Sequence, residues 1–425
     1  MTSAPRPLTL RTVEVDLAGR ELTGLLAGLE PSAAWVREGD GLIGLGEAAR
    51  TTASGPRRFE RLAQVWDELG TEHSDLVAFV SVTFSAESEY TSLLVVPEVL
   101  IRTDDDGGAR VIITDDGQGD TVSVLARHGL VLEGRSLRLA GPGTPPPLPR
   151  TALQAGTRSQ AQYLSAVTAG LSAIGDGTVE KLVLARDVVV SADAPVPAGP
   201  LLARLAADYP QTWTYRVGQM LGATPEMLVQ LRGDRLFSRV LAGTVDHAAS
   251  AQSLLADGKQ RREHHLAVAS LRDQLAPLTD SLQSAADPRL LELPNVYHLA
   301  TDVTGTLART DDDGLPGPLE VAYAAHPTAA VCGTPTGAAG QLIEQLEGLD
   351  RGPFAGPIGW MDAAGNAEFG IALRGGVLEE EAHRVRLYAG AGIVAGSDPK
   401  AELAETESKL RPMLSALGLP YTASG

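Results

Sequence analysis

The sequence is poor in cysteine and in positive charge. Its 425 residues include a single cysteine, Cys332, so the chain can form neither an intrachain disulfide nor a cysteine-based zinc site. It has 35 lysines and arginines against 53 aspartates and glutamates, which gives a formal net charge of −18. Because nucleic acids and anionic membranes are bound through clustered lysine and arginine, we expect neither as a partner. A local positive pocket for a small anion is still compatible with this balance.

Long hydrophobic runs are missing as well. No apolar run approaches the length of about 18 residues that suggests a membrane-spanning helix. Residues 1–20 lack the apolar region of a signal peptide, so we expect a cytoplasmic protein without a membrane association. Hydrophobic residues nevertheless make up 44% of the chain, which is enough for a sizeable core. The length suits one very large domain or two to three ordinary ones.

Nucleotide-binding motifs are also absent. No G-x-x-x-x-G-K-[ST] sequence occurs, and the glycine-rich stretch "AGAGIVAGSDP", residues 389–399, does not have the dinucleotide spacing. Its glycines, which include Gly390 and Gly392, precede a helix that we expect to begin at Pro399, after the N-cap acceptor Asp398. A helix N-terminus behind glycines can hold an anion through backbone N–H groups. The stretch therefore predicts a loop that binds an anion other than a nucleotide.

The order of the predicted elements favours an α+β fold with antiparallel sheets. Strand-like runs with tight turns are separated by single long helices, without the strict alternation of a doubly wound sheet. The proline- and glycine-rich stretch at residues 139–153 is either a surface connection or a boundary. We place the boundary there, between a variable N-terminal part of the same fold, residues 1–150, and a catalytic core, residues 151–425.

Apolar periodicity predicts one long amphipathic helix over residues 262–282. Its apolar positions recur at spacings of three and four, and the last of them are Leu275, Leu278 and Leu282. Glu263 lies at the start of this helix, off the leucine stripe. A carboxylate there is either a favourable charge at the helix N-terminus or a metal ligand.

Two more carboxylates lie in the last helix. Glu402 and Glu405 are three residues apart and share one helical face, and Lys409 follows Glu405 by four residues. They form either a solvated face with one ion pair or a carboxylate pair aimed at a hard cation, which prefers oxygen ligands. A cation would need a further acid from elsewhere, and Glu263 is the candidate.

Other polar residues stand in apolar surroundings. Lys181 opens the strand-like run "KLVLARDVVV" and is either an edge-strand gatekeeper or a buried lysine that can act as a base. Glu226 lies between two strand-like runs, and in a closed apolar site its raised pKa would let it donate a proton. Taken singly, His298 and His326 are more typical of hydrogen-bonded core histidines than of catalytic ones.

Together these segments resemble the chorismate-utilising enzymes: anthranilate synthase large component, aminodeoxychorismate synthase, isochorismate synthase and salicylate synthase. The resembling stretches follow the family's order between residues 181 and 410: "KLVLARDV", "GATPEMLV", "VLAGTV", "REHHLAV", "YHLATDVTGTL", "HPTAAVCGTP", "GPIGWMDAAGNAEFGIALRGG" and "YAGAGIVAGSDPKAELAETESKL". Each stretch is a weak signal, but the ordered set is strong. The resemblance implies a large single domain in which two packed, mainly antiparallel sheets are flanked by helices.

The resemblance also implies how the ligands are held. It implies a Mg²⁺ ion that bridges to the substrate and is bound by glutamates: Glu263, Glu405 and, in contact with the ion or just beyond it, Glu402. It implies substrate contacts through cations and backbone amides, which suit the two carboxylates of chorismate: Thr244, Arg374, Gly390, Gly392 and Lys409. Where anthranilate synthases carry another acid three residues before Glu263, this chain has Gln260, so a fourth carboxylate is missing.

Two positions of the resemblance separate the branches of the family. Enzymes that add ammonia carry glutamine where this chain has Lys181, and aminodeoxychorismate synthases carry a nucleophilic lysine where it has Ala242. The single cysteine is not in a nucleophile motif, so we expect no glutaminase subunit. The isochorismate synthase branch is left, with Lys181 as the base that activates water and Glu226 as the proton donor to the departing 4-hydroxyl. His298 is a third candidate catalytic residue, which would either orient the bound ring or, in relatives, assist lyase chemistry.

Salicylate synthase is the nearest alternative, because it forms the same intermediate and then eliminates pyruvate. It shares the positions of Lys181 and Glu226, although "HPTAAVCGTP" is more similar to dedicated isochorismate synthases. A non-catalytic chorismate-binding protein and an unrelated metal hydrolase that uses the three glutamates are more distant alternatives. We expect a monomeric isomerase whose product feeds menaquinone or siderophore biosynthesis, and the sequence does not distinguish these two pathways.

Overall fold

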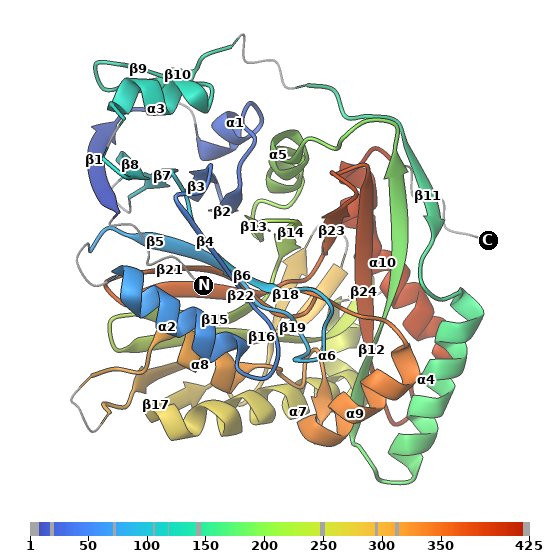
Figure 1. Ribbon diagram of the computed structural model, residues 1–425. Helices are drawn as coiled ribbons and strands as arrows, with labels where there is room; N and C mark the ends of the chain where they lie inside the picture. The colour runs from blue at the N-terminus through green and yellow to red at the C-terminus, as the bar shows by residue number, and fades with distance from the viewer. Residues whose placement is uncertain are drawn as a thin grey trace.

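Two large antiparallel β-sheets with flanking helices dominate the computed structural model (Figure 1). It describes residues 8–17, 21–70, 74–104, 107–117, 119–141, 146–246, 251–293, 296–310 and 314–419. The predicted fold class, α+β with two packed antiparallel sheets in one domain, is confirmed. Among the described residues, no helix is both long and apolar enough to cross a membrane.

The first sheet has 12 strands, most of which follow one continuous path. In spatial order they are β1 (Thr9–Val15), β8 (Ala109–Asp115), β7 (Val99–Thr103), β3 (Asp40–Leu45), β2 (Ala33–Arg37), β13 (Trp213–Val217), β14 (Met220–Thr224), β23 (Gly375–Glu379), β24 (Arg384–Val394), β12 (Lys181–Ala192) and β11 (Thr151–Ala155), with β20 (Gly333–Thr334) also beside β12. The first ten residues of β12 are all buried, which explains why apolar residues fall on both of its faces, interrupted only by Lys181, Arg186 and Asp187.

The second sheet has 10 strands. They are β17 (Thr279–Ser284), β19 (Val296–Leu307), β16 (Arg235–Asp246), β15 (Met227–Arg232), β22 (Ala367–Ile371), β21 (Pro357–Asp362), β5 (Val77–Ser81), β6 (Ser92–Val96) and β4 (Ala49–Ala53), with β18 (Arg289–Leu293) beside β19. A separate hairpin joins β9 (Leu130–Glu133) to β10 (Ser136–Leu139).

The helices cover the sheets and divide the core into three clusters. They are α1 (Leu22–Leu26), α2 (Arg58–Gly70), α3 (Thr121–Arg127), α4 (Gln160–Gly175), α5 (Ala198–Asp208), α6 (Ala251–Ala256), α7 (Gly258–Leu275), α8 (Pro318–Ala325), α9 (Thr336–Glu347) and α10 (Pro399–Ala416). The largest cluster joins the two sheets through aromatic residues such as Trp35, Phe79 and Phe369. The other two clusters lie where α1, α5 and α10, or α4 and α9, pack on the first sheet. Burial of these apolar faces is the main stabilising contribution.

The predicted long helix over residues 262–282 is wrong in its last third, residues 276–282. Helix α7 ends at Leu275, a short 3-10 turn follows over Ala276–Leu278, and Leu282 belongs to β17. Pro277 lies in that turn, and a proline cannot continue the helical hydrogen bonding. Leu278 and Leu282 still pack against the core between the sheets, so their apolar spacing reflects burial and not one helix.

Strands from both sides of residue 150 share both sheets. In the first sheet β2 pairs with β13, and in the second sheet β5 pairs with β21. The division of the chain at residue 150 into a variable part and a core stays a prediction. The sheets themselves show no break at that point.

This interleaving predicts that residues 151–425 do not fold by themselves. Without residues 1–150, the edges of β13 and β21 lose their partners and the core between the sheets is exposed. We expect the fragment to show no cooperative thermal transition in circular dichroism, whereas the full chain shows one. A cooperative transition of the fragment close to that of the full chain would show that the core is an independent unit.

Candidate active site

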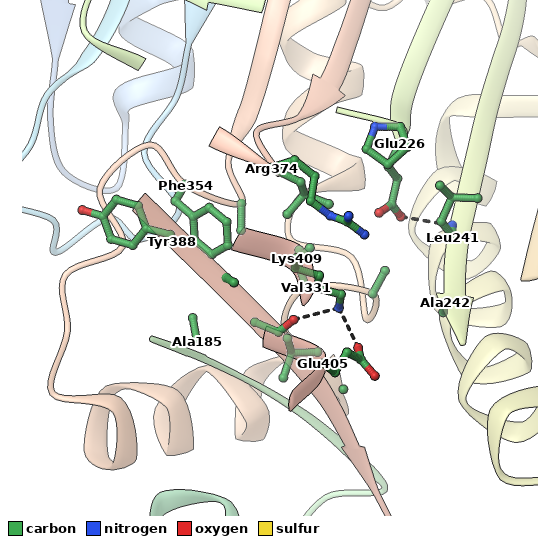
Figure 2. Close-up of a pocket in the computed structure, with 18 of the residues that line it drawn as sticks. Ala185, Glu226, Leu241, Ala242, Val331, Phe354, Arg374, Tyr388, Glu405 and Lys409 are labelled. Carbon is green, nitrogen blue, oxygen red and sulfur yellow. Dashed lines mark hydrogen bonds and ion pairs between the residues drawn. The ribbon is translucent and has the colours of Figure 1, made fainter. Parts of the chain in front are cut away.

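A cavity between the two sheets collects most of the predicted site residues (Figure 2). Eight of them line it: Glu226, Glu263, His298, Arg374, Gly390, Gly392, Glu405 and Lys409. Lys181 and Glu402 lie next to this group through ion pairs described below. The backbone of Thr244 pairs with His298 in the second sheet, and its side chain lies outside the described part of the chain. Segments far apart in the sequence therefore converge on one site.

Lys181 is completely buried at the start of β12. Its Nζ lies 3.1 Å from Oε1 of Glu263, on the first helical turns of α7. The alternative that Lys181 is an edge-strand gatekeeper is wrong, because β12 pairs with β24 on one side and with β20 on the other at this point. A buried ammonium needs a counter-charge, and Glu263 supplies it.

Glu226 occupies the turn between β14 and β15 and is buried. Its Oε1 accepts a hydrogen bond of 3.3 Å from the backbone N–H of Leu241. Burial raises the pKa of Glu226 to about 7, although the Leu241 N–H and the charges of Lys181, Lys409 and Arg374 oppose the shift. A carboxyl group with this pKa exchanges its proton near neutral pH, as a general acid must.

Arg374 and His298 face each other in the cavity. Nη2 of Arg374 donates to Nε2 of His298 at 3.2 Å, so this imidazole nitrogen is an acceptor. Burial, and then the charge of Arg374, keep the pKa of His298 well below its usual range, so the ring is neutral. Burial also lowers the pKa of Arg374 to about 10. Figure 2 shows Glu226, Arg374 and Lys409 pointing into the same space.

Each of the three predicted metal-binding glutamates is paired with a lysine. The Nζ–Oε1 distances are 3.1 Å for Lys181–Glu263, 2.8 Å for Lys259–Glu402 and 2.7 Å for Lys409–Glu405. Glu402 is only 2% exposed, so a solvated face is the wrong alternative for it. Burial and the neighbouring Glu405 raise the pKa of Glu402, while Lys259 lowers it.

The three glutamates suit Mg²⁺ by their chemistry. Carboxylate oxygens are the ligands that this ion prefers, and Glu263 and Glu405 both line the cavity. Within the described ranges, however, no three acidic, histidine or cysteine side chains lie close enough together to form a complete metal site. The three carboxylates form ion pairs with lysines instead. A metal ion would therefore have to displace at least one of these lysines.

The predicted glycine loop is wrong in its geometry, because Gly390 and Gly392 lie inside strand β24. Gly392 is opposite Val183 of β12, whose N–H donates to Cys332 and not to β24. Gly392 and Val183 are therefore a non-hydrogen-bonded pair of the antiparallel ladder. In such a pair the N–H groups of both residues point away from the opposite strand. The N–H of Gly392 is therefore directed away from β12, and the same holds for Gly390 opposite Ala185.

Gly392 also makes room for the carboxylate of Glu263. A Cβ atom at this position would lie 2.0 Å from Oε1 of Glu263 and 3.3 Å from Cε of Lys181. No side chain fits there without moving one of the two groups. The helix after the strand begins as predicted, since the side chain of Asp398 accepts from the N–H of Ala401.

Lys259 and Arg351 are site residues that sequence reasoning missed. Lys259 lies in the first turn of α7, where a positive charge opposes the helix dipole, and this misplacement is a signal that could have identified it. Arg351 follows α9 in an irregular segment and has no comparable signal. His326 lies outside the cavity and its Nε2 contacts the carbonyl of Phe84, as expected for a core histidine.

The chain belongs to the chorismate-binding enzyme family, whose model matches residues 34–418. Isochorismate synthase DhbC of Bacillus subtilis is 36% identical over 277 residues, which cover 61% of this chain and 68% of the relative. The vibriobactin-specific isochorismate synthase of Vibrio cholerae is 34% identical over 270 residues, which cover 61% and 67%. The solved structure of MenF, the menaquinone-specific isochorismate synthase of Escherichia coli, superimposes with a TM-score of 0.76 at 25% identity and covers 97% of this chain and 95% of its own. The predicted family and its isochorismate synthase branch are confirmed.

The raised pKa of Glu226 predicts a pH-dependent effect of its removal. Below about pH 4 the folded and unfolded states both hold the proton, so E226Q should have little effect on stability there. As pH rises toward 7, the unfolded chain ionises while the folded chain keeps the proton, and the wild type alone loses stability. At pH 8 we expect E226Q to be more stable than the wild type by about 3 kcal/mol, from about 1.4 kcal/mol per pKa unit. Urea unfolding at several pH values measures this, and a pH-independent difference would contradict it.

Proposed function

We propose that this protein is an isochorismate synthase, an isomerase that converts chorismate to isochorismate. Water is added at ring carbon 2 while the hydroxyl group leaves carbon 4. The observation that carries the proposal is the joint placement of Lys181 and Glu226. Glu226, a buried carboxyl group with a pKa of about 7, lines the cavity, and the buried amine of Lys181 lies beside Glu263, which lines the cavity too. The same cavity also holds cations for an anionic substrate.

The two carboxylates of chorismate account for the cations of the site. Arg374 and Lys409 both line the cavity and can each contact one of them. The outward N–H groups of Gly390 and Gly392 add backbone donors on the same side as Lys409, whose Nζ donates to the carbonyl of Gly390 at 2.8 Å. The side chain of Thr244 is proposed as a further contact from the resemblance alone.

Glu263 and Glu405, with Glu402 in contact or just beyond, are the residues proposed to hold Mg²⁺. When bound, the ion supplies positive charge against a substrate carboxylate. Gln260 takes the place of a fourth acid, so the protein would bind the ion with three carboxylates at most.

The acid–base chemistry is divided between two side chains. Lys181, released from its ion pair with Glu263 and acting as the free amine, takes a proton from the water that attacks carbon 2. Glu226 gives its proton to the hydroxyl group that leaves carbon 4, and the ring double bonds shift between the two carbons. One water enters and one leaves, so the reaction is an isomerisation. Neutral His298, held by Arg374, orients the ring.

Product analysis tests the proposal. Purified protein with chorismate and Mg²⁺ should produce isochorismate in equilibrium with chorismate. Salicylate with equimolar pyruvate would instead identify a salicylate synthase. Chorismate-induced thermal stabilisation without any product would identify a binding protein, and indifference to chorismate would contradict the whole assignment.

Replacing Lys181 with alanine tests its role as the base. General base catalysis contributes about 100- to 10,000-fold, so K181A should lower kcat by that order. Chorismate should still raise the melting temperature of the folded variant, because the cations that bind the carboxylates are unchanged. Unchanged turnover in K181A would rule out this role.

The close approach of Gly392 to Glu263 predicts that G392A weakens metal binding. The new Cβ pushes the Glu263 carboxylate away, and we expect the Mn²⁺ dissociation constant to rise about tenfold or more in a titration followed by electron paramagnetic resonance. G258A is the matched control. Gly258 lies on the same helix as Glu263, and a Cβ atom there would meet nothing within 4 Å. Equal affinities of G392A and the wild type would contradict the assignment of Glu263.

The oligomeric state, the cellular location and the pathway are also part of the proposal. We propose a monomer that acts in the cytoplasm without a glutaminase subunit. Its product would supply menaquinone or siderophore biosynthesis, and the relatives named above include an enzyme specific for each. Induction of the protein by iron starvation would favour the siderophore pathway, and constitutive expression would favour menaquinone.

A further inference from the structure

One edge of β12 is not covered by a strand beside the cavity. On this edge β20 pairs with Lys181 and Leu182, and β11 pairs with Val188–Ala192. In the described part of the chain, no strand pairs with the residues between them. Buried backbone N–H and C=O groups need partners, so this gap must be filled in another way.

A side-chain ion pair fills the gap. Oε1 of Glu347 accepts the N–H of Ala185 at 2.7 Å, and Nη2 of Arg351 donates to the carbonyl of Val183 at 2.8 Å. Arg351 and Glu347 also bond each other, with Nε to Oε2 at 2.9 Å. The pair therefore replaces, with one acceptor and one donor, two of the hydrogen bonds that a neighbouring strand would make, while the N–H of Val183 donates to the carbonyl of Cys332.

The ion pair is anchored on its other side. Nη1 of Arg351 donates to the carbonyl of Val331 at 2.8 Å, and the guanidinium lies 4.3 Å from the ring centroid of Phe84. The side chains of Arg351 and Glu347 are 2% and 1% exposed. Glu347 ends α9, which packs beside β12 (Figure 1). Such a doubly bonded arginine–carboxylate pair fixes geometry as well as charge.

Arg351 lines the cavity but is not available to the substrate as a cation. Its Nε, Nη1 and Nη2 groups all donate to protein oxygens, and Glu347 neutralises its charge. Arg374 differs from Arg351 because it donates to the neutral imidazole of His298 rather than to a carboxylate that would neutralise its charge.

We infer that Arg351 and Glu347 form a positioning pair that fixes the segment of β12 carrying Lys181. Lys181, Val183 and Ala185 alternate along one face of the strand, and the last two line the cavity. Holding Val183 and Ala185 therefore sets where the Lys181 amine lies relative to Glu263 and the substrate. This inference rests on the proposed role of Lys181 as the base. A misplacement of about 1 Å in such a group can cost about 100-fold in rate.

Replacing Arg351 with methionine tests the inference. R351M should lower kcat by about 10- to 100-fold while KM for chorismate changes by less than about threefold, because the substrate cations stay in place. R351K keeps the positive charge but lacks the planar set of N–H donors of the guanidinium group, so it should recover only part of kcat. Amide hydrogen exchange at Ala185 should become faster in R351M than in the wild type.

R386M is the matched control. Arg386 also ion-pairs with a buried carboxylate of β12, Asp187, at the far end of the gap, and neither residue lines the cavity. It should lower the melting temperature while leaving kcat within about twofold of the wild type. If R351M does not fold, E347Q, which leaves Arg351 with an uncharged partner, takes its place with the same expected loss of kcat.

Three outcomes would overturn the inference. These are a wild-type kcat in folded R351M or E347Q, a rise of KM alone, or an equal loss of kcat in R386M. Failure of the proposed function is distinguishable, because then the wild type makes no isochorismate while the exchange measurement at Ala185 still tests the pair.

Discussion

The contact between Lys181 and Glu263 is the interaction on which the rest of the site depends. It joins β12 of the first sheet to α7, which packs on β16 and β19 of the second sheet. Loss of one partner of a buried ion pair leaves the other charge uncompensated, which costs about 3–5 kcal/mol. Gly392 of β24 leaves the space in which the two groups meet. The active-site cavity therefore lies where both sheets, one helix and one glycine are held together.

The charges of the cavity explain how an acidic protein can bind a dianion. The chain carries a formal charge of −18, but each of the three glutamates proposed to hold Mg²⁺ is paired with its own lysine. Arg374 adds a cation, and burial leaves Glu226 close to half protonated at neutral pH. The cavity is thus locally balanced or positive within an acidic molecule, and a divalent cation and a dicarboxylate can enter it together without a net change in charge.

Much of the fold class and of the site could be predicted from local sequence, and the errors have physical causes. The ordered motifs brought Lys181, Glu226, Glu263 and the C-terminal glutamates to one place, although their roles stay proposals. The end of α7 was misplaced because Leu278 and Leu282 are buried like helix residues but follow Pro277. The sequence around Gly390 and Gly392 predicts a loop because loops are often rich in glycine. Here a glycine lies in a strand instead, because the Glu263 carboxylate occupies the space that a side chain would need. Long-range partners such as Lys259 and Glu402, 143 residues apart, leave no periodic pattern.

The origin of the oxygen atom at ring carbon 2 tests the central claim most directly. If Lys181 activates a water molecule inside the cavity, chorismate converted in water enriched in ¹⁸O gives isochorismate with the heavy atom in its 2-hydroxyl group. Mass spectrometry of the product after a single forward conversion should show one ¹⁸O per molecule at that position. Isochorismate that keeps only the ¹⁶O of the original 4-hydroxyl would mean that the hydroxyl migrates without solvent water, and would contradict the roles given to Lys181 and Glu226.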